Sequence, residues 1–281
     1  MYGIDNYFFF PVLSIFSSLI LLLGIDFAGQ QIFKIKILNE VVSNISLVSF
    51  QRIIFTLNIL LFILYPLILY KFYSLFFLNL ISYLFFFLGL INFGKIILSS
   101  KNIIKIIKSH LVTQRLLLFS IFIFFYFLFV LGPIGSADSL DYHAGVAQSI
   151  INLGTFPVNS YAFHEKLAGS GEILVAIGLL MGAEQFGTLI QFSGFIGIIG
   201  IFLKFLNIKK NTFNFYIFLS IICAPVFLFL SSTYKPQLFH IASNLLAFAM
   251  LFLNFRKKNF FFIFFFLFIY FNDLNASKIF I

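Results

Sequence analysis

The side chains best suited to chemistry gather between Ser136 and Glu172. This is the only long segment that Phe, Ile and Leu do not dominate, and it holds four of the nine acidic residues and two of the four histidines. Asp138 and Asp141 are three residues apart, and His143 follows two residues later. Two carboxylates with a histidine can supply a general base or bind a divalent cation such as Mg²⁺ or Mn²⁺. This segment is therefore the candidate site.

One amphipathic helix is predicted over residues 139–153, with Ser136 or Asp138 as its N-cap and Gly154 as its C-terminal stop. On an α-helix, residues three apart share a face, so the two carboxylates would point into one cavity and His143 would lie to the side. The alternative is that Asp138 only caps the helix and Asp141 only faces water.

Two further polar groups are candidates for the site, one within this segment and one later in the chain. His164 and Glu165 follow an extended loop, where they would contact a substrate, complete a metal site or form a solvated turn. Lys235 lies between two apolar stretches, followed by Pro236 and Gln237. A lysine at the level of lipid head groups can bind phosphate as a point charge, or simply extend its ammonium into water.

The rest of the chain has the composition of an integral membrane protein. It is 62% hydrophobic and 10% charged, with a mean hydropathy of +1.09. Apolar runs long enough to cross a bilayer recur along the chain, and only helices satisfy every backbone group within one segment in lipid. The fold class expected is therefore all-α, a polytopic transmembrane bundle of about eight spans, at residues 7–28, 53–70, 75–94, 116–133, 186–206, 212–231, 238–255 and 259–272.

Lysine and arginine positions predict how the chain is oriented. With the N-terminus outside, 14 of the 18 basic residues fall on the inner side, as the positive-inside rule requires. The net charge of +9 is then explained by topology rather than by nucleic-acid binding. This orientation places the N-terminus and the loop 134–185 outside the cytoplasm.

Two regions are expected along the chain. Residues 1–115 would form a three-span bundle ending in a basic interfacial helix at 101–108, on the cytoplasmic surface. Residues 116–281 would carry the outer loop and the later spans. In that loop, the apolar run that follows Glu172 is about 11 residues long, too short to span, so a second helix on the outer membrane surface is expected there.

The order of these features resembles the GT-C glycosyltransferases, polytopic enzymes that use lipid-phosphate sugars, and especially their bacterial branch similar to protein mannosyltransferases and aminoarabinose transferases. Residues 138–143, Asp-Ser-Leu-Asp-Tyr-His, match a D-x-x-x-Y-H pattern of the first outer loop. Lys235-Pro236-Gln237 is similar to an R-P-D triplet, with Gln237 replacing its acid, and Ser277-Lys278 is similar to a later T-K pair. The likeness covers about residues 116–281.

The resemblance implies transfer of a sugar from a polyprenyl-phosphate donor to a glycan, lipid or protein acceptor outside the cytoplasm. It implies that Asp138, or else Asp141, activates the acceptor hydroxyl or helps hold a metal, and that basic residues hold the donor phosphate. The residues expected at the site are Asp138, Asp141 and His143 for catalysis, and Tyr142, His164, Glu165, Lys235, Gln237 and Lys278 for substrate binding. The alternatives are a non-catalytic membrane subunit with a partner chain, a polysaccharide or lipid carrier, or an inactive fragment, since the family's chains usually continue for several more spans.

Overall fold

The computed structural model describes residues 11–35, 45–72, 74–109, 114–157, 169–205 and 212–254. Every regular element in these ranges is a helix, as expected. The elements are α2 (Pro11–Ile32), α4 (Val48–Leu69), α5 (Ser74–Ser109), α6 (Gln114–Val130), the π-helix η1 (Asp138–Ala144), α7 (Gly145–Leu153), α8 (Ser170–Leu180), α9 (Phe186–Phe205), α10 (Thr212–Ile222), α11 (Pro225–Ser231) and α12 (Gln237–Asn254). The predicted span 259–272 lies outside the described residues.

Four of these helices, α2, α4, α5 and α9, are long and apolar enough to cross a membrane. A fifth span results if α10 and α11 are taken together. The chain therefore has several helices with the length and composition of membrane spans, whereas α6 and α12 contribute the shorter apolar stretches Leu118–Val130 and Gln237–Phe252. Residues 101–108 form the last turns of the long helix α5 rather than a separate helix.

A bend of 50° separates α10 from α11, within the stretch 212–231 that we expected to form one span. Pro225 is the first residue of α11, and the preceding Ala224 is extended, because proline disfavours a helical conformation in the residue before it. The break frees backbone carbonyls, and the hydroxyl of Tyr126 in α6 donates to one of them, the oxygen of Ile222, at 2.9 Å. The side chain from a neighbouring helix thus satisfies a polar group that lipid would leave unpaired.

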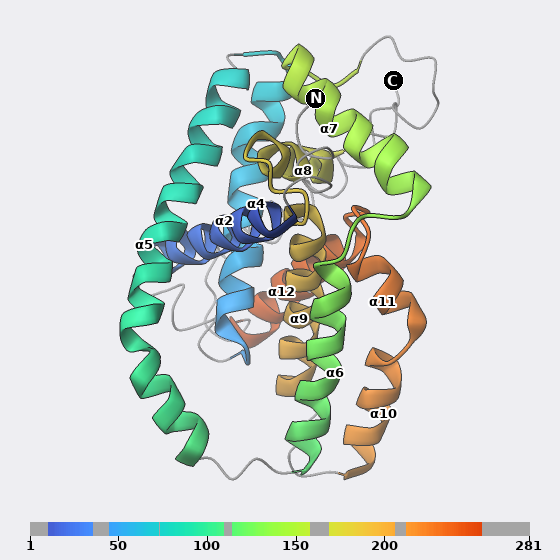
Figure 1. Cartoon of the computed structure of the whole chain (residues 1–281). Helices are drawn as coiled ribbons and strands as arrows, with labels where there is room; N and C mark the ends of the chain where they lie inside the picture. Colours follow the sequence, from blue (N-terminus) through green and yellow to red (C-terminus); the bar gives the residue numbers. More distant parts are fainter. Residues whose placement is uncertain are drawn as a thin grey trace.

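Helix α9 is the centre of the molecule, where it packs against α2, α4, α6, α8, α11 and α12 (Figure 1). Its residues from Phe186 to Ile201 are buried on all sides. Glycines allow the closest approach: a Cβ at Gly194 would lie 2.7 Å from the backbone of Leu238 in α12. Small residues at such crossings let helix backbones pack tightly where lipid provides no hydrophobic driving force.

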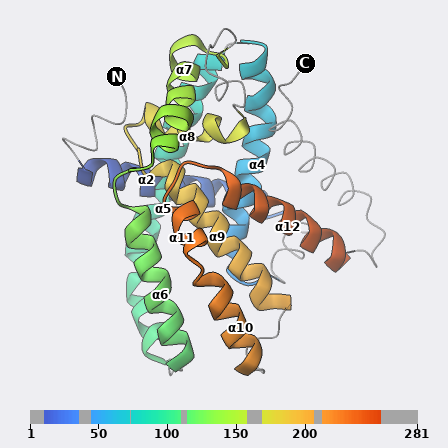
Figure 2. The same ribbon diagram turned by 90° about the vertical axis from the view of Figure 1, so that its right-hand side faces the viewer.

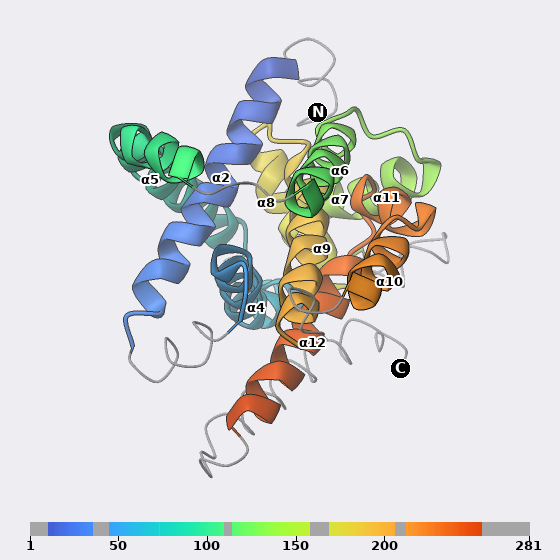
Figure 3. The ribbon, with the colours of Figure 1, turned by 90° about the horizontal axis from the view of Figure 1, so that it is seen from below.

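Not all long helices run in the same direction. In Figure 1, α4, α5, α6 and α10 run along the long axis of the molecule, whereas α2 crosses α4 and α5. The view along that axis shows α2 and α12 lengthwise and α5 and α6 nearly end-on (Figure 3). At the α2–α5 crossing, a Cβ at Gly24 or at Gly89 would lie 1.9 Å from a backbone oxygen of the other helix.

Helix α8 forms where the sequence predicts a second loop helix, but protein surrounds it. Its residues from Ser170 to Leu179 are buried, and it packs against α4, α5, α7, η1 and α9. Figure 2 shows it in the interior, beneath α7. Its apolar character, which we interpreted as contact with a membrane surface, is instead explained by contact with other helices.

Candidate functional site

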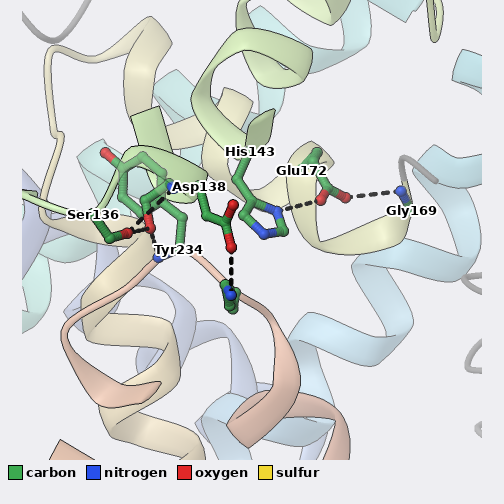
Figure 4. A network of polar contacts seen from close by, with 8 residues as sticks. Ser136, Asp138, His143, Gly169, Glu172 and Tyr234 are labelled. Carbon is green, nitrogen blue, oxygen red and sulfur yellow. Dashed lines mark hydrogen bonds and ion pairs between the residues drawn. The ribbon is translucent and has the colours of Figure 1, made fainter. Parts of the chain in front are cut away.

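Three segments meet at the candidate site: η1, the first turn of α8, and the loop from α11 to α12 (Figure 4). The Oδ2 of Asp138 lies 2.6 Å from the Nζ of Lys235. Asp138 is the residue expected to activate an acceptor, and Lys235 is the residue expected to bind phosphate. The structure therefore brings together two side chains that the sequence could only place on the same side of the membrane.

Hydrogen bonds of Ser139 hold the start of η1 against the loop that carries Lys235. The hydroxyl of Ser136 accepts a bond from the amide of Ser139 at 3.2 Å, and the two hydroxyls are 2.5 Å apart. The Ser139 hydroxyl in turn accepts a bond from the amide of Tyr234 at 3.1 Å, next to Lys235 in the chain. Of the two caps considered above, Ser136 is the one whose side chain closes the start of the helix. The carboxylate of Asp138 is left to pair with Lys235.

The π-helical form of residues 138–144 changes which side chains share a face. A π-helix bonds each residue to the one five positions away, so residues five apart lie one above the other. Asp138 and His143 are five apart, and Figure 4 shows the Asp138 carboxylate beside the His143 ring. The expectation that His143 would lie to the side assumed an α-helix. The π-helical form instead brings the His143 ring toward the face of the helix that carries Asp138.

His143 is held by a residue to which the sequence assigned no role. Its Nδ1 lies 2.7 Å from Oε1 of Glu172, and the two side chains are 8% and 2% exposed. The second carboxylate oxygen, Oε2, accepts the amide of Gly169 at 2.9 Å. Glu172 is in the first turn of α8, where the helix dipole also favours a negative charge. An acid three residues into an apolar helix is a recognisable capping signal, but its partner on η1 is not visible in the sequence.

Gly171 explains how α8 and the loop before α12 approach so closely. A Cβ at this position would lie 2.5 Å from the Cβ of Pro236 and 2.6 Å from its Cγ. The Gly-Ser-Gly sequence before Glu172 therefore allows the start of α8 to lie against the Lys235-Pro236 turn. The three segments of the site are packed directly on one another.

Two tyrosines border the site as neutral hydrogen-bonding groups. Burial, and to a lesser extent the charge of Glu172, raise the pKa of Tyr142, whose ring lies 4.3 Å from that of His143. Burial, and then the charge of Glu184, raise the pKa of Tyr234 well above 10.0. The hydroxyl of Tyr234 donates to the backbone oxygen of Glu184 at 2.7 Å, which ties the loop to the start of α9.

The remaining predicted site residues are not brought into this arrangement. Asp141 and Gln237 are exposed, at η1 and at the first residue of α12, and their roles stay predictions. His164, Glu165 and Lys278 lie outside the described residues. Within the described ranges, no three acidic, histidine or cysteine side chains are grouped to hold a metal ion. A cation at Asp138 would also meet the positive charge of Lys235, whose ammonium lies 2.6 Å from the carboxylate.

An open groove of about 630 Å³ begins next to the ion pair. It lies between α6 and α11, and its lining is mostly apolar, with three residues that carry hydroxyl groups. The lining residues are Leu128, Phe129, Gly132, Pro133, Gly135, Ser136, Phe229, Ser232 and Thr233. Ser136 belongs to the site described above. The Nζ of Lys235 lies 5.6 Å from the centre of the Phe229 ring, so the groove reaches the lysine.

A family model described as the DUF1420 N-terminal domain matches this chain over residues 1–123 and 110–279. The chain belongs to the DUF1420 family. The match includes all three segments of the site, from Asp138 to Lys235. The description of this DUF1420 domain names no activity. Searches of curated proteins and of solved structures found no match.

Proposed function

We propose that this DUF1420 chain is a membrane glycosyltransferase that moves a sugar from a polyprenyl-phosphate donor to a hydroxyl of a glycan, lipid or protein outside the cytoplasm. The observation that carries the proposal is the Asp138–Lys235 pair at the end of the α6–α11 groove. A donor of this kind has an apolar tail, an anionic phosphate and a polar sugar. The groove, the lysine and the aspartate are three environments that suit these three parts in the same order.

Lys235 would supply a positive charge where the proposed reaction develops negative charge. When an acceptor hydroxyl attacks the anomeric carbon, the bond from that carbon to the phosphate oxygen breaks and its electron pair leaves with the polyprenyl phosphate. The proton of the hydroxyl passes to a base on the enzyme. The ammonium of Lys235 would stabilise the departing phosphate, since preorganised charge at a leaving group lowers the barrier.

The pairing of Asp138 with Lys235 suits a site that responds to its donor. The side chains of Lys235 and Asp138 are 24% and 64% exposed, so a phosphate could reach the lysine from solvent. A phosphate bound to Lys235 would compete with the aspartate for the ammonium, leaving the carboxylate to contact the sugar or the acceptor. The predicted orientation, with this loop outside the cytoplasm, puts both groups at the surface to which lipid-linked sugars are presented.

The second reading is a non-catalytic membrane subunit, in which the same ion pair only holds η1 against the α11–α12 loop. The test compares envelope glycans of a deletion strain complemented with wild type, Asp138→Asn, Lys235→Ala or Gln148→Ala. Gln148 lies on α7, where its side chain donates to Asn152, and it serves as the control. Loss of one sugar in the deletion strain, restored by wild type and Gln148→Ala but not by the other two, supports the transferase. Full restoration by both site variants at equal protein level contradicts it.

A further inference from the structure

We infer that His143, held by Glu172, is the general base of the transfer reaction, and that Asp138 instead controls Lys235. This inference rests on the proposed function and assigns roles within its site. The histidine pairs with Glu172 on α8, its ring lies against that of Tyr142, and Figure 4 shows the Asp138 carboxylate, the partner of Lys235, beside the ring.

Both carboxylate oxygens of Glu172 have a partner in the structure. Oε2 accepts the Gly169 amide at 2.9 Å, and Oε1 is 2.7 Å from the histidine. A backbone amide can only donate, so Oε2 is an acceptor. The first turn of α8 favours a negative charge, and in an ionised Glu172 both oxygens are acceptors.

The partner of Nδ1 decides the tautomer of His143. Because an ionised Glu172 can only accept, the neutral imidazole must carry its proton on Nδ1 and donate it to Oε1. The lone pair is then on Nε2, on the opposite side of the ring. Figure 4 shows the Asp138 carboxylate on that side of His143, away from Glu172. A base whose tautomer and orientation are fixed by a buried carboxylate is the arrangement that activates hydroxyl nucleophiles in other enzymes.

Asp138 and His143 are the two candidate bases. The carboxylate of Asp138 is engaged by the Lys235 ammonium at 2.6 Å, so one of its oxygens already has a partner. His143 is engaged by Glu172 at Nδ1, and Nε2 is the nitrogen on the other side of its ring. His143 is therefore better placed to accept the acceptor's proton from Nε2, and the charge of Glu172 stabilises the imidazolium that forms.

Glu172→Gln gives the sharpest test, because the geometry dictates its outcome. The Gly169 amide requires an oxygen, so the new amide must turn its oxygen to Gly169 and its NH₂ toward His143. Nδ1 then becomes an acceptor, the ring carries its proton on Nε2, and the base is blocked without loss of volume. Glu172 is a positioning residue in this scheme, and His143 is the residue that contacts the acceptor.

The tautomer is read by nitrogen NMR of the full chain in detergent, with isotope-labelled histidine and with His143→Ala to assign the signal. Wild type should show a neutral His143 protonated at Nδ1, and Glu172→Gln should show it protonated at Nε2. The Gln148→Ala control should match wild type. A wild-type ring protonated at Nε2 would overturn the inference, since the histidine could not then accept a proton from that nitrogen.

Activity is measured as release of polyprenyl phosphate in detergent extracts of the deletion strain's membranes, which supply both the polyprenyl-phosphate sugar and the acceptor hydroxyl that receives the sugar. His143→Ala should lower kcat by about 100-fold to 10,000-fold, the usual contribution of a general base, with little change in KM. Imidazole added to the buffer should restore part of this loss. Glu172→Gln should lower kcat at least about tenfold and should not respond to imidazole, because the blocked ring still fills the site.

The outcomes separate the inference from the proposed function. If His143→Ala keeps wild-type kcat while Asp138→Asn and Lys235→Ala lose activity, the transferase stands and the base is not His143. If wild type releases no polyprenyl phosphate and complements no sugar, the proposed function itself fails. A kcat loss in His143→Ala that imidazole does not relieve, with an unfolded NMR spectrum, would assign the histidine a structural role and overturn the inference.

Discussion

Asp138 and His143 are five residues apart on a π-helix, and Figure 4 shows the carboxylate of the first beside the ring of the second. Were it an α-helix, Asp138 would share a face with Asp141 instead. The structure therefore predicts that the two aspartates differ in importance. Asp138→Asn removes the partner of Lys235 and should lower transfer activity by about tenfold to 100-fold, whereas Asp141→Asn should have the smaller effect. Polyprenyl-phosphate release by the two purified variants, compared at equal protein concentration, measures this difference. Equal losses of activity in the two variants would contradict this prediction, because they would indicate that both carboxylates face the site, as they would on an α-helix.

Gly171 provides a prediction about how the site is assembled. Gly171→Ala would place a methyl group 2.5 Å from Pro236, and the turn that carries Lys235 would have to move. We expect a loss of about 1–3 kcal/mol in unfolding free energy, together with loss of the Asp138–Lys235 pairing. Thermal unfolding in detergent measures the first effect, and the activity assay measures the second.

The matched control for this change is Gly145→Ala. No heavy atom lies within 4 Å of a Cβ built at Gly145, and the residue is the first of α7. This variant should be as stable as wild type or slightly more so, because alanine favours a helix over glycine. If the two alanine variants unfold at the same temperature, the close packing of α8 against the α11–α12 loop is not a feature of the folded protein.

The crossing of α2 over α5 yields a third prediction. Gly89→Ala would place a Cβ 1.9 Å from the backbone oxygen of Ile20, so the two helices must separate. Loss of about 3 kcal/mol is expected. Gly94→Ala, on the same helix with no atom within 4 Å, should leave stability unchanged or raise it. Unfolding temperatures of both variants in one detergent make the comparison.

Tyr234 predicts how stability depends on alkaline pH. Burial raises the pKa of this phenol in the folded protein, while in the unfolded chain it ionises near 10.0. Its contribution to stability is therefore fully present below pH 10.0 and is lost as the pH rises through the folded-state pKa. Tyr234→Phe cannot ionise, so its unfolding temperature should fall less than that of wild type between about pH 9 and about pH 11.

The same variant has a cost at neutral pH. Tyr234→Phe removes the hydrogen bond to the backbone oxygen of Glu184, and we expect it to be less stable than wild type by about 1 kcal/mol at pH 7. The two unfolding curves should thus approach each other as the pH rises. Parallel curves over the whole range would show that Tyr234 ionises alike in the folded and the unfolded chain.

The sequence alone determined the helical class and most helix positions. In lipid, a long apolar run satisfies its backbone hydrogen bonds within one segment only as a helix. It located the end of α7 at Gly154, which has a φ of 72° that glycine adopts without strain. It also singled out the polar segment that begins at Ser136. These features depend on hydrophobicity and on local backbone preference, both of which are written in neighbouring residues.

Only the tertiary structure decided which polar side chains meet. The π-helical pitch of η1 placed His143 beside Asp138, the buried position of α8 brought Glu172 to the histidine, and the packing of Gly171 on Pro236 brought Lys235 to the aspartate. Each of these contacts joins segments far apart in the chain or depends on a helix geometry that local sequence does not specify. These contacts arise from the close packing of η1, α8 and the α11–α12 loop. The residue pattern within one segment does not specify which other segments pack against it.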